Sequence, residues 1–537
     1  MSPADANESP IPSLEARLAQ LEQMAAQIEP LTHERDEYKK LYLLLLEENE
    51  RLKRGLLGQK AERLGANDQQ LSLKLIELLL GAQQPDAAAP AAPPPEHPVA
   101  AHTRKQAVRQ PLPEHLPRVV IEILPPEVEA EGRDQFECIG VETREVLERR
   151  PASLVVVETR KPKFVRKDRP REGSTLVLKA ATPELPIERG LAGPGLLADT
   201  IVKRWQDHLP LHRQESIFAR EGLELARSTL CGWHELLAEL VRPVVDAMWV
   251  DALLQPYLCI DATGVMVQAL EKCRHGHFFV VVAPELHALF GFSAEHSGAA
   301  VDRLLPGYAG YLVADASSVY DHLYRTGKVL EVGCWAHARR YHFKALPSDP
   351  DRAKQAITYI GALFQIERTL AGAPAREKRA VRQEKSKPVV DQYFGWCQTE
   401  SERVLDGSPI SKAINYSVNQ EDGLRRFLED GRLPLHNNIS ELQLRREAVG
   451  RKNWLFVGSE DGATVNATFV SLLASCSLHR IEPWAYLRDL LCLLPSWPRK
   501  RVLELAPAYF KHTLEQREAQ EQLSANVYRQ VVLGTRS

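Results

Sequence analysis

The sequence lacks the features of a secreted, disulfide-stabilised or membrane-spanning protein. Its eight cysteines are scattered and no two form a C-x-x-C pair, which argues against both a disulfide framework and a four-cysteine zinc site. The first residues show no basic segment followed by an apolar one, and no apolar run reaches the length of a membrane span. We therefore expect a reducing, cytoplasmic setting and no membrane partner.

The chain also lacks an excess of charge of either sign. Its formal net charge is -3, with 26% charged and 44% hydrophobic residues, which is ordinary for a globular protein. A nucleic-acid-binding protein of this balance must gather its basic residues into local patches. At 537 residues the chain is too long for one core, so we expect three or more units.

The N-terminal part has the pattern of a helix followed by a linker. Apolar residues in 13–57 alternate at spacings of four and three, with an interruption at Pro30. Asn49 stands at a core position, where an Asn fixes the register of a two-stranded coil. This pattern favours a dimerising zipper; an amphipathic helix packed on its own chain is the alternative. Residues 82–103 are rich in Ala and Pro and are typical of a linker.

A strand-rich segment and then a helical segment follow the linker. Runs such as RVVIEIL and SLVVVETRKPKFV predict a small β-rich unit in residues 111–178. Residues 195–249 are helical in pattern, with a turn at Glu221–Gly222 and with Ser228 at the expected position of a helix cap. A helix, a turn with Gly and a capped helix are the layout of a helix-turn-helix reader, although any helical hairpin gives a similar pattern.

From Tyr257 onward the predicted elements follow the order of a ribonuclease-H-like fold. PYLCIDATGVMVQ, HFFVVVA and HALFGF predict a three-stranded meander, and the helix GAAVDRLLP and the strand GYLVADAS come next. A short helix, the strand VLEVGC and a helix from Trp335 complete the order. The first and fourth strands of that fold are neighbours. We therefore expect Asp261, in the first strand, to face Asp315, at the end of the fourth.

Facing carboxylates suit metal-dependent chemistry on a phosphodiester. Two divalent ions about 3.5–4 Å apart activate the nucleophile and the leaving oxygen, and hard oxygen ligands suit Mg²⁺ or Mn²⁺. A third carboxylate is expected on a later helix, and Glu441 is the candidate because residues 438–449 look helical. As alternatives, a lone Asp in a strand can lie at an edge or turn, and Glu441 can pair with Arg445 one helical turn on.

The distance along the chain between the second and third carboxylates predicts an insertion. Asp315 and Glu441 are 126 positions apart, which is too far for a bare fold of this type. Residues 346–430 have a helical pattern, with Ile357, Ile360 and Phe364 on one face. We therefore expect a helical insertion within the catalytic domain.

Seven stretches of the sequence are similar to the large transposase of the insertion sequence 66 family: DHLPLHRQESIFAREGLELARSTLCGW, CIDATG, GYLVADASSVYDHL, VGCWAHARRYHFKA, NNISE, GRKNWLFVGS and IEPWAYLRDLL. The resemblance extends from the zipper to the C-terminus. It implies a DDE transposase that acts on the inverted repeats of a mobile element. Asp261, Asp315 and Glu441 would be its catalytic and metal-binding triad, with two Mg²⁺ or Mn²⁺ ions as cofactors.

The resemblance also implies residues that support the triad or contact DNA. Cys334 and His337 form the C-x-x-H pair that follows the second Asp, and we expect structural support from them and from Asn437 and Asn438, without zinc. Phosphate neutralisation gives sequence-independent affinity for DNA. We therefore assign DNA contacts to residues of the helix-turn-helix and to basic residues near the motifs, namely Arg213, Arg227, Ser228, Arg339, Arg340, Arg445, Arg446, Arg451 and Lys452.

The sequence departs from the family in two regions. Members usually carry a small zinc unit built on two C-x-x-C pairs, but only Cys138 remains here, and Arg166 and Arg169 stand in place of the second pair. One thiolate cannot hold a structural zinc, so we expect a metal-free unit. Its basic residues suit phosphate contact; a solvated basic loop is the alternative. His436 stands where relatives more often have Asp, and Leu442 where they tend to have Arg.

These observations predict a multidomain α+β protein in which a ribonuclease-H-like catalytic domain follows three smaller parts. The sequence does not decide whether Arg445 and Arg446 face DNA or the helical insertion. The predicted units are an N-terminal coiled coil (1–81), an Ala/Pro linker (82–110), a small basic β-rich unit (111–180), a helix-turn-helix region (181–250), a catalytic domain (251–500) with its insertion (346–430), and a C-terminal helical tail (501–537).

The expected function is DNA transposition. The protein would bind double-stranded DNA at the element ends and at the target, as a homodimer or higher oligomer, and would lie in the cytoplasm at the nucleoid. The resemblance also implies companion proteins of the same element as partners. Two alternatives stay open: a decayed or repurposed transposase that only binds DNA, and a nuclease or resolvase on the same fold.

Overall fold

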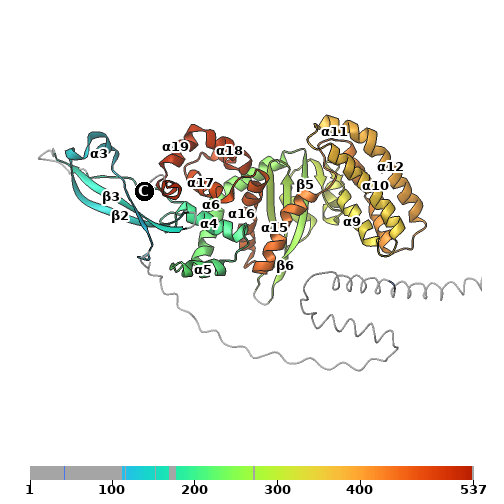
Figure 1. The fold of residues 1–537 in the computed structure, drawn as a ribbon, viewed down its shortest axis with the longest axis horizontal. Coiled ribbons are helices and arrows are strands. Elements are labelled where there is room, and N and C mark those ends of the chain that lie inside the picture. Colours follow the sequence, from blue (N-terminus) through green and yellow to red (C-terminus); the bar gives the residue numbers. More distant parts are fainter. Residues whose placement is uncertain are drawn as a thin grey trace, which may run out of the picture. The chain divides into compact units, whose positions relative to one another are not determined.

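The computed structural model describes Tyr42 and residues 112–114, 116–150, 153–167, 177–269 and 272–534 (Figure 1). Apart from Tyr42, which is helical, the predicted zipper and linker lie outside these residues. All other described residues belong to one unit that begins at Arg109. This unit is a mixed α+β structure that contains two mixed sheets.

The first sheet is dominated by two long antiparallel strands. They pair along their length with one register shift between Cys138 and Gly140, and a third strand joins in parallel. The sheet order is β1-β3-β2, and β4 pairs with β3. The elements of this region are β1 (Arg118–Glu122), α3 (Pro126–Glu131), η1 (Arg133–Gln135), β2 (Phe136–Arg150), β3 (Ser153–Arg166) and β4 (Leu178–Lys179).

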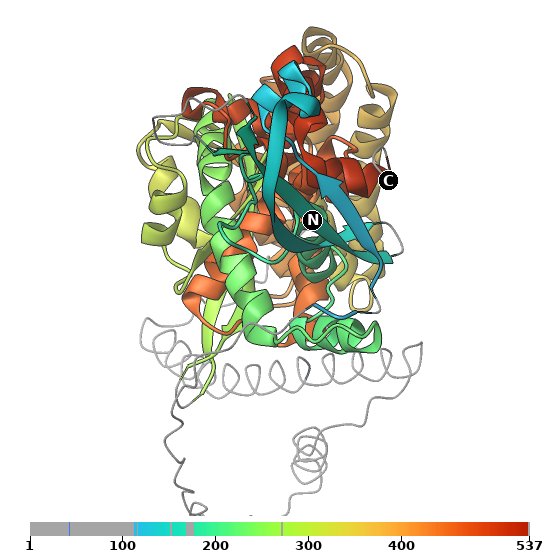
Figure 2. The same cartoon turned by 90° about the vertical axis from the view of Figure 1, so that its left-hand side faces the viewer.

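The C-terminal helix of the described chain packs on this sheet. Tyr528 and Val531, on α20 (Val527–Leu533), share a buried apolar cluster with Val146 of β2 and Val157 of β3. In Figure 2, which views the molecule from the side of the β2–β3 hairpin, the C-terminus lies beside these strands. The last helix therefore covers a sheet that is formed by residues almost four hundred positions earlier in the sequence.

Three helices follow the first sheet: α4 (Pro194–Trp205), α5 (Leu211–Arg220) and α6 (Arg227–Leu253). The predicted turn at Glu221–Gly222 is present, and Gly222 has a φ of +79°, which favours Gly. The predicted cap at Ser228 is wrong. Ala226 takes the N-cap position and Ser228 lies exposed in the first turn. The backbone N–H of Arg227, the first residue of the helix, donates to the carboxylate of Glu215.

Helix α6 is longer than a recognition helix needs to be. Beyond its exposed first turn it buries Leu230, Trp233, Leu237 and Met248. It packs against β7 of the second sheet and against α16 (Glu460–Leu478). The domain boundary expected at residue 250 falls in its last turn.

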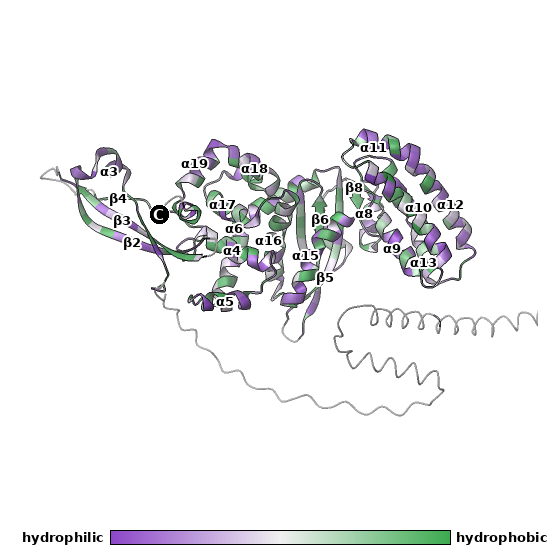
Figure 3. Cartoon of the chain, in the orientation of Figure 1, coloured by the Kyte–Doolittle hydropathy of each residue, from purple (hydrophilic) through white to green (hydrophobic). Residues whose placement is uncertain are grey.

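The second sheet has the predicted strand order, β7-β6-β5-β8-β9. β5, β6 and β7 form an antiparallel meander, and β8 and β9 run parallel to β5. β6 is buried from Phe278 to Ala283, as in a strand that is covered on both faces. In Figure 3 this strand is coloured green, as hydrophobic residues are. The strands are β5 (Tyr257–Val267), β6 (Arg274–Ala283), β7 (His287–Ser293), β8 (Gly310–Val313) and β9 (Val329–Val332).

Helix α16 closes the β7 edge of this sheet. The backbone N–H groups of Ala288 and Phe290 donate to the hydroxyls of Ser475 and Ser471, at 3.0 and 2.8 Å. These bonds satisfy strand groups that would otherwise stand open at an edge. The shorter elements between the strands are α7 (Gly298–Leu304), η2 (Ser318–Tyr320) and α8 (Asp321–Tyr324), and α9 (Trp335–Ala345) follows β9.

The expected insertion is helical. Its core is aromatic, with Trp335 of α9 against Tyr393, Phe394 and Phe427. On its first helix Ile360 is buried as expected, whereas Ile357 and Phe364 are only partly buried. The insertion consists of α10 (Pro350–Thr369), α11 (Ala375–Val381), the π-helical turn η3 (Arg382–Ser386), α12 (Lys387–Ser401), α13 (Pro409–Asn419), α14 (Glu421–Arg425) and η4 (Arg426–Leu428).

Helices complete the chain after the insertion. α17 packs against α4, and within the described residues no helix combines the length and the apolar character needed to cross a membrane. These elements are α15 (Asn438–Trp454), α16, α17 (Pro483–Leu493), η5 (Arg499–Leu505), α18 (Pro507–Glu515), α19 (Arg517–Ala525) and α20.

Candidate active site

Asp261 and Asp315 lie at matching positions on adjacent parallel strands. β5 and β8 pair in a register that aligns Cys259 with Val313, the last partners of the ladder. Asp261 and Asp315 each come two residues later, and side chains two residues apart in a strand point to the same face. Asp315 lies two residues beyond the end of β8, and its charge acts on the pKa of Asp261, so the two carboxylates are neighbours.

The surroundings of Asp261 disfavour its charged form. Burial, together with the nearby charges of Asp315 and Glu441, raises the pKa of Asp261 to about 7. A hydrogen bond from the backbone N–H of Ala262, 2.7 Å from Oδ1, acts in the opposite direction. The three acidic side chains are therefore close enough to repel one another, and a bound cation would relieve that repulsion.

Asn437 ties the helix of Glu441 to this strand. Its side-chain amide donates to the carbonyl oxygen of Ile260 at 2.7 Å, and its backbone N–H donates to Sγ of Cys334 at 3.2 Å. Asn437 is fully buried and is the N-cap of α15, so Glu441 lies in the first turn that it anchors. Cys334 and Asn437 thus connect β5, α9 and α15 beneath the carboxylates.

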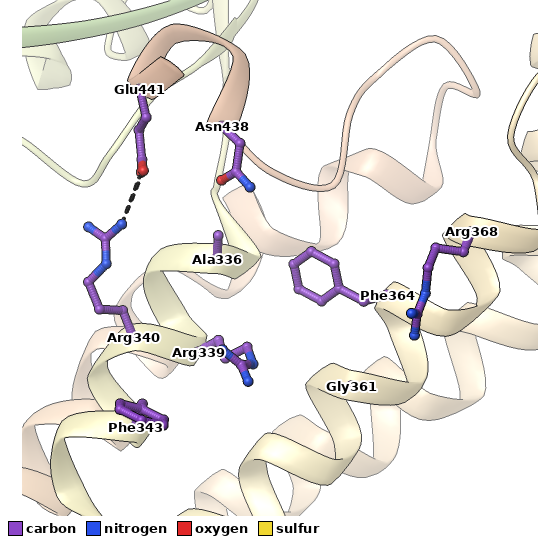
Figure 4. Close-up of a pocket in the computed structure, with 9 residues that line it drawn as sticks. All are labelled: Ala336, Arg339, Arg340, Phe343, Gly361, Phe364, Arg368, Asn438 and Glu441. Carbon is purple, nitrogen blue, oxygen red and sulfur yellow. Dashed lines mark hydrogen bonds and ion pairs between the residues drawn. The ribbon is translucent and has the colours of Figure 1, made fainter. Parts of the chain in front are cut away.

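Glu441 is paired with one residue of α9 and lies close to another. Nη2 of Arg340 lies 3.1 Å from Oε2 of Glu441, and Nε2 of His337 lies 3.4 Å from Oε1. Figure 4 shows the Glu441 and Arg340 side chains pointing toward each other. The alternative pairing of Glu441 with Arg445 is wrong, because α9 supplies the partner instead.

The burial of His337 favours its neutral form. Burial lowers its pKa, although the Glu441 charge acts in the opposite direction. A neutral ring nitrogen can accept a hydrogen bond, and Nη1 of Arg340 lies 3.2 Å from Nε2 of His337. His337 therefore helps to orient Arg340 toward Glu441.

The carboxylate oxygens at this site suit a hard cation, although the three carboxylates do not form one cluster. Among the described residues, no group of three His, Cys, Asp or Glu side chains is placed to hold a metal ion. The adjacent carboxylates of Asp261 and Asp315 match the ligands that Mg²⁺ and Mn²⁺ prefer.

The small β-rich unit has one cysteine at the expected position. Cys138 is exposed on β2, and its thiol donates to the carbonyl oxygen of Gly140 at 3.5 Å. Arg166 forms an ion pair with Glu131 and lies over the ring of Phe136, whereas Arg169 lies outside the described residues. A zinc-free unit remains a prediction.

Most of the residues assigned to DNA are exposed. Arg227, at the start of α6, forms an ion pair with Glu215 of α5 at 3.4 Å, which joins the two helices of the candidate helix-turn-helix. Asn438, expected to support the site, is exposed at the first position of α15. The exposed candidates for DNA contact are Arg213, Arg227, Ser228, Arg339, Arg340, Arg445 and Lys452.

Arg446 and Arg451 contact the protein itself. Arg446 donates to Gln206 at 2.6 Å and to Ser477, and burial lowers its pKa. It therefore faces α4 and α16, and not the insertion. Arg451 donates to Thr263 at 3.0 Å and to the carbonyl oxygen of Gly264, so it fastens the end of α15 to β5. The assignment of these two residues to DNA stays a prediction.

Sequence reasoning missed a basic pocket beside Glu441. The pocket has a volume of about 670 Å³, and Phe343, Gly361, Phe364 and Arg368 line it together with Arg339 and Arg340. The spacing of Gly361, Phe364 and Arg368 puts them on one face of α10. That spacing was the available signal, but the sequence does not show what the face meets.

Comparisons with known proteins identify the family. The profile described as "Transposase IS66 family" matches residues 189–465, and the one described as "Transposase C of IS166 homeodomain" matches residues 44–121. The uncharacterised protein y4hP of Sinorhizobium fredii is 32% identical over 489 residues, 86% of this chain and 88% of its own length. Proteins y4qI and y4jD of the same organism are 31% and 30% identical, over 86% and 71% of this chain and 87% and 77% of their own lengths. The chain belongs to the IS66 transposase family, whose DDE domain implies a ribonuclease-H-like core, DNA binding and transposase catalysis with divalent metal.

Proposed function

We propose that the protein binds the terminal inverted repeats of an insertion sequence and catalyses metal-dependent cleavage and strand transfer with Asp261, Asp315 and Glu441. The observation that carries this proposal is the parallel register of β5 and β8, which pairs Cys259 with Val313, two residues before Asp261 and Asp315. The anchor from Asn437 to Ile260 supports it, because it holds the first turn of α15 next to the same strand. Membership of the IS66 transposase family indicates the class of reaction, which is DNA transposition.

The chemistry consists of two displacements at phosphorus. In the first, the oxygen of a water molecule bonds to phosphorus, the bond to the 3′ oxygen breaks, and a 3′-hydroxyl is freed at the element end. In the second, that hydroxyl attacks a phosphodiester of the target, and the target's own 3′ oxygen leaves. Two bound divalent ions would lower the pKa of the attacking group and stabilise the leaving oxygen.

The residues of the chain prepare the site for this reaction. Asp261 and Asp315 would hold the ions, and Glu441 would complete the ligand set after it leaves Arg340. The pKa of about 7 for Asp261 means that its carboxylate is poised to ionise when positive charge arrives. Arg339 and Arg340, both exposed on α9, would neutralise phosphates beside the reacting one.

End recognition is assigned to the candidate helix-turn-helix. Arg213 near the start of α5 and Arg227 and Ser228 at the start of α6 are all exposed. The zipper expected in residues 13–57 would make the protein a homodimer or higher oligomer, and companion proteins of the element would join it on DNA.

Cleavage of a labelled duplex that carries the terminal repeat of the element tests the catalytic proposal. The wild-type protein is expected to nick the repeat end with Mg²⁺ or Mn²⁺, whereas Asp261→Asn binds the same duplex without cutting it. Asp406→Asn, an exposed position in the insertion, is the matched control and is expected to cut normally. Cutting by Asp261→Asn at the wild-type rate would refute the assignment of Asp261.

A DNA-binding protein without catalysis is the second candidate. The observation that favours it is the ion pair between Arg340 and Glu441, which occupies the third carboxylate. Binding of the repeat by the wild-type protein, with no cutting when the companion proteins of the element are also present, would decide for this candidate.

A further inference from the structure

A pocket of about 670 Å³ lies between two helices next to Glu441. One wall is α9, which contributes Arg339 and Phe343, and the other is α10, which contributes Phe364 and Arg368 (Figure 4). The start of α15 closes one end. The volume is within the range of sites for small molecules, about 300–1,000 Å³.

The pocket carries positive charge that no protein group balances. Among the residues described, neither the Arg339 nor the Arg368 guanidinium has an ion-pair or hydrogen-bond partner, and both are exposed. Arg340, at the side of the pocket, is paired with Glu441. Two free guanidinium groups on facing helices are suited to phosphate oxygens, which arginine binds through its planar fork of donors.

The same pocket offers aromatic faces. Phe343 is 57% exposed, which is a high exposed fraction for a Phe side chain. Phe364 stacks on His436, with ring centres 5.6 Å apart and an angle of 12° between the planes. His436 holds that ring in place from the loop that leads to Glu441. Aromatic rings beside arginines are typical of sites where unpaired nucleic-acid bases stack.

The floor of the pocket is kept open by Gly361. A Cβ built on this residue meets nothing within 4 Å. A Gly in the interior of a helix costs about 0.5–1 kcal/mol relative to Ala, and no close neighbour requires Gly at this position. A larger side chain at this position would project into the pocket, so a substitution of Gly361 can be used to fill the pocket.

We propose that this pocket is a subsite for one unpaired nucleotide of the DNA strand that enters the active site, with its base against Phe343 and Phe364 and its phosphate between Arg339 and Arg368. This inference rests on the proposed function. Glu441 and Arg340 belong both to the pocket and to the candidate active site, so the occupant has to be a neighbour of the reacting phosphate. The bases of an intact duplex are stacked and paired, so an aromatic ring can stack only on a base that leaves the helix.

A binding comparison tests the subsite without catalysis. The full-length protein is titrated, without divalent metal, with a blunt duplex and with the same duplex carrying a short single-stranded 3′ or 5′ extension. The wild type is expected to bind one extended probe about tenfold more tightly, the effect of one well-stacked base. Gly361→Leu is expected to abolish this preference and to leave blunt-duplex affinity unchanged, whereas Gly361→Ala preserves the preference.

Cross-linking provides a second measurement. A 5-iodouracil in the extension is expected to cross-link, on irradiation, to Phe343 or Phe364, within peptides of α9 or α10. Arg368→Ala, an exposed position, is expected to reduce the preference several-fold, and it serves if Gly361→Leu does not fold. Equal affinity of the wild type for all three probes, an undiminished preference in both variants, or a cross-link outside α9 and α10 would overturn the subsite.

The outcomes for the subsite and for the catalytic proposal are separable. Asp261→Asn retains the pocket, so it is expected to keep the preference for the extended probe while it loses cleavage. If the wild-type protein does not cleave DNA but prefers the extended probe, and Gly361→Leu removes that preference, the result supports the subsite and counts against the catalytic proposal. Normal cleavage with no preference counts against the subsite alone.

Discussion

The side-chain amide of Asn437 donates a 2.7 Å hydrogen bond to the carbonyl oxygen of Ile260, a residue 177 positions earlier in the chain. Ile260 immediately precedes Asp261 on β5, and Glu441 follows Asn437 by about one helical turn. Because Asn437 is fully buried, this bond is shielded from water and holds the strand and the helix in register. The distance between the proposed catalytic carboxylates of Asp261 and Glu441 therefore depends on the side-chain amide of Asn437.

Asn437→Ala is expected to lower both stability and cleavage. The substitution leaves the buried carbonyl of Ile260 without this donor, which costs about 1–3 kcal/mol, and it frees the first turn of α15. Thermal unfolding and cleavage of the terminal-repeat duplex are the measurements. Asn438→Ala is the matched control for stability, because Asn438 is adjacent but exposed. Equal unfolding midpoints for the two variants would contradict the role of the buried amide.

Arg340→Gln is expected to increase the affinity of the protein for Mn²⁺ several-fold. In the wild type the Arg340 guanidinium lies 3.1 Å from Glu441, so an incoming ion has to compete with it. The ion pair is half exposed and worth at most about 1 kcal/mol, so little change in unfolding temperature is expected. Calorimetric titration with Mn²⁺ measures the effect without DNA.

Arg339→Gln is the control for that measurement. It removes the same charge from the adjacent position on α9, but Arg339 does not contact Glu441. An equal rise in Mn²⁺ affinity in both variants would mean that general charge, and not release of Glu441, governs metal binding.

Arg445 and Arg446 are expected to behave differently although they are adjacent. Arg446→Ala removes the hydrogen bonds to Gln206 and Ser477 and is expected to lower the unfolding temperature. Arg445 is exposed, so Arg445→Ala is expected to leave stability unchanged and to reduce the salt dependence of DNA binding by about one unit of slope. Binding isotherms at several salt concentrations, with melting curves, distinguish the two residues. A lower unfolding temperature for Arg445→Ala, together with a reduced salt slope for Arg446→Ala, would show that the exposed face of α15 does not contact DNA.

The sequence predicted best those features that depend on local pattern. The strands β5 to β9 were predicted because apolar runs with short connections have few other folds, and their order then placed Asp261 beside Asp315. Features set by contacts across the chain could not be predicted. The sequence alone does not show which face of α15 is covered, so Arg446 was assigned to DNA. The Ser228 cap was wrong because the helix begins earlier, at Arg227, where Glu215 of the preceding helix accepts the backbone N–H.

Glu447 makes the stability of the protein depend on pH. It is only 4% exposed, on α15, and accepts a hydrogen bond from Asn466 at 3.2 Å. Burial raises its pKa to about 7, against an opposing effect of the Arg204 charge. In the unfolded chain a Glu has a pKa of about 4.3, so the folded protein binds this proton more tightly. Its contribution to stability is therefore fully present below about pH 4 and is lost as the pH rises to about 7.

Glu447→Gln imitates the protonated side chain and is expected to remove that loss. The variant should be more stable than the wild type at neutral pH, by an amount that grows between pH 5 and pH 7 and then levels off, because above the folded pKa both states bind no proton. Unfolding temperatures measured across this range test it. Glu239→Gln, at an exposed position on α6, is the control and should follow the wild-type curve. Asp261 titrates in the same range in all three proteins, so only the difference between the curves of the variant and the wild type reports on Glu447. A difference that does not vary with pH would show that the Glu447 carboxyl is not protonated in the folded state.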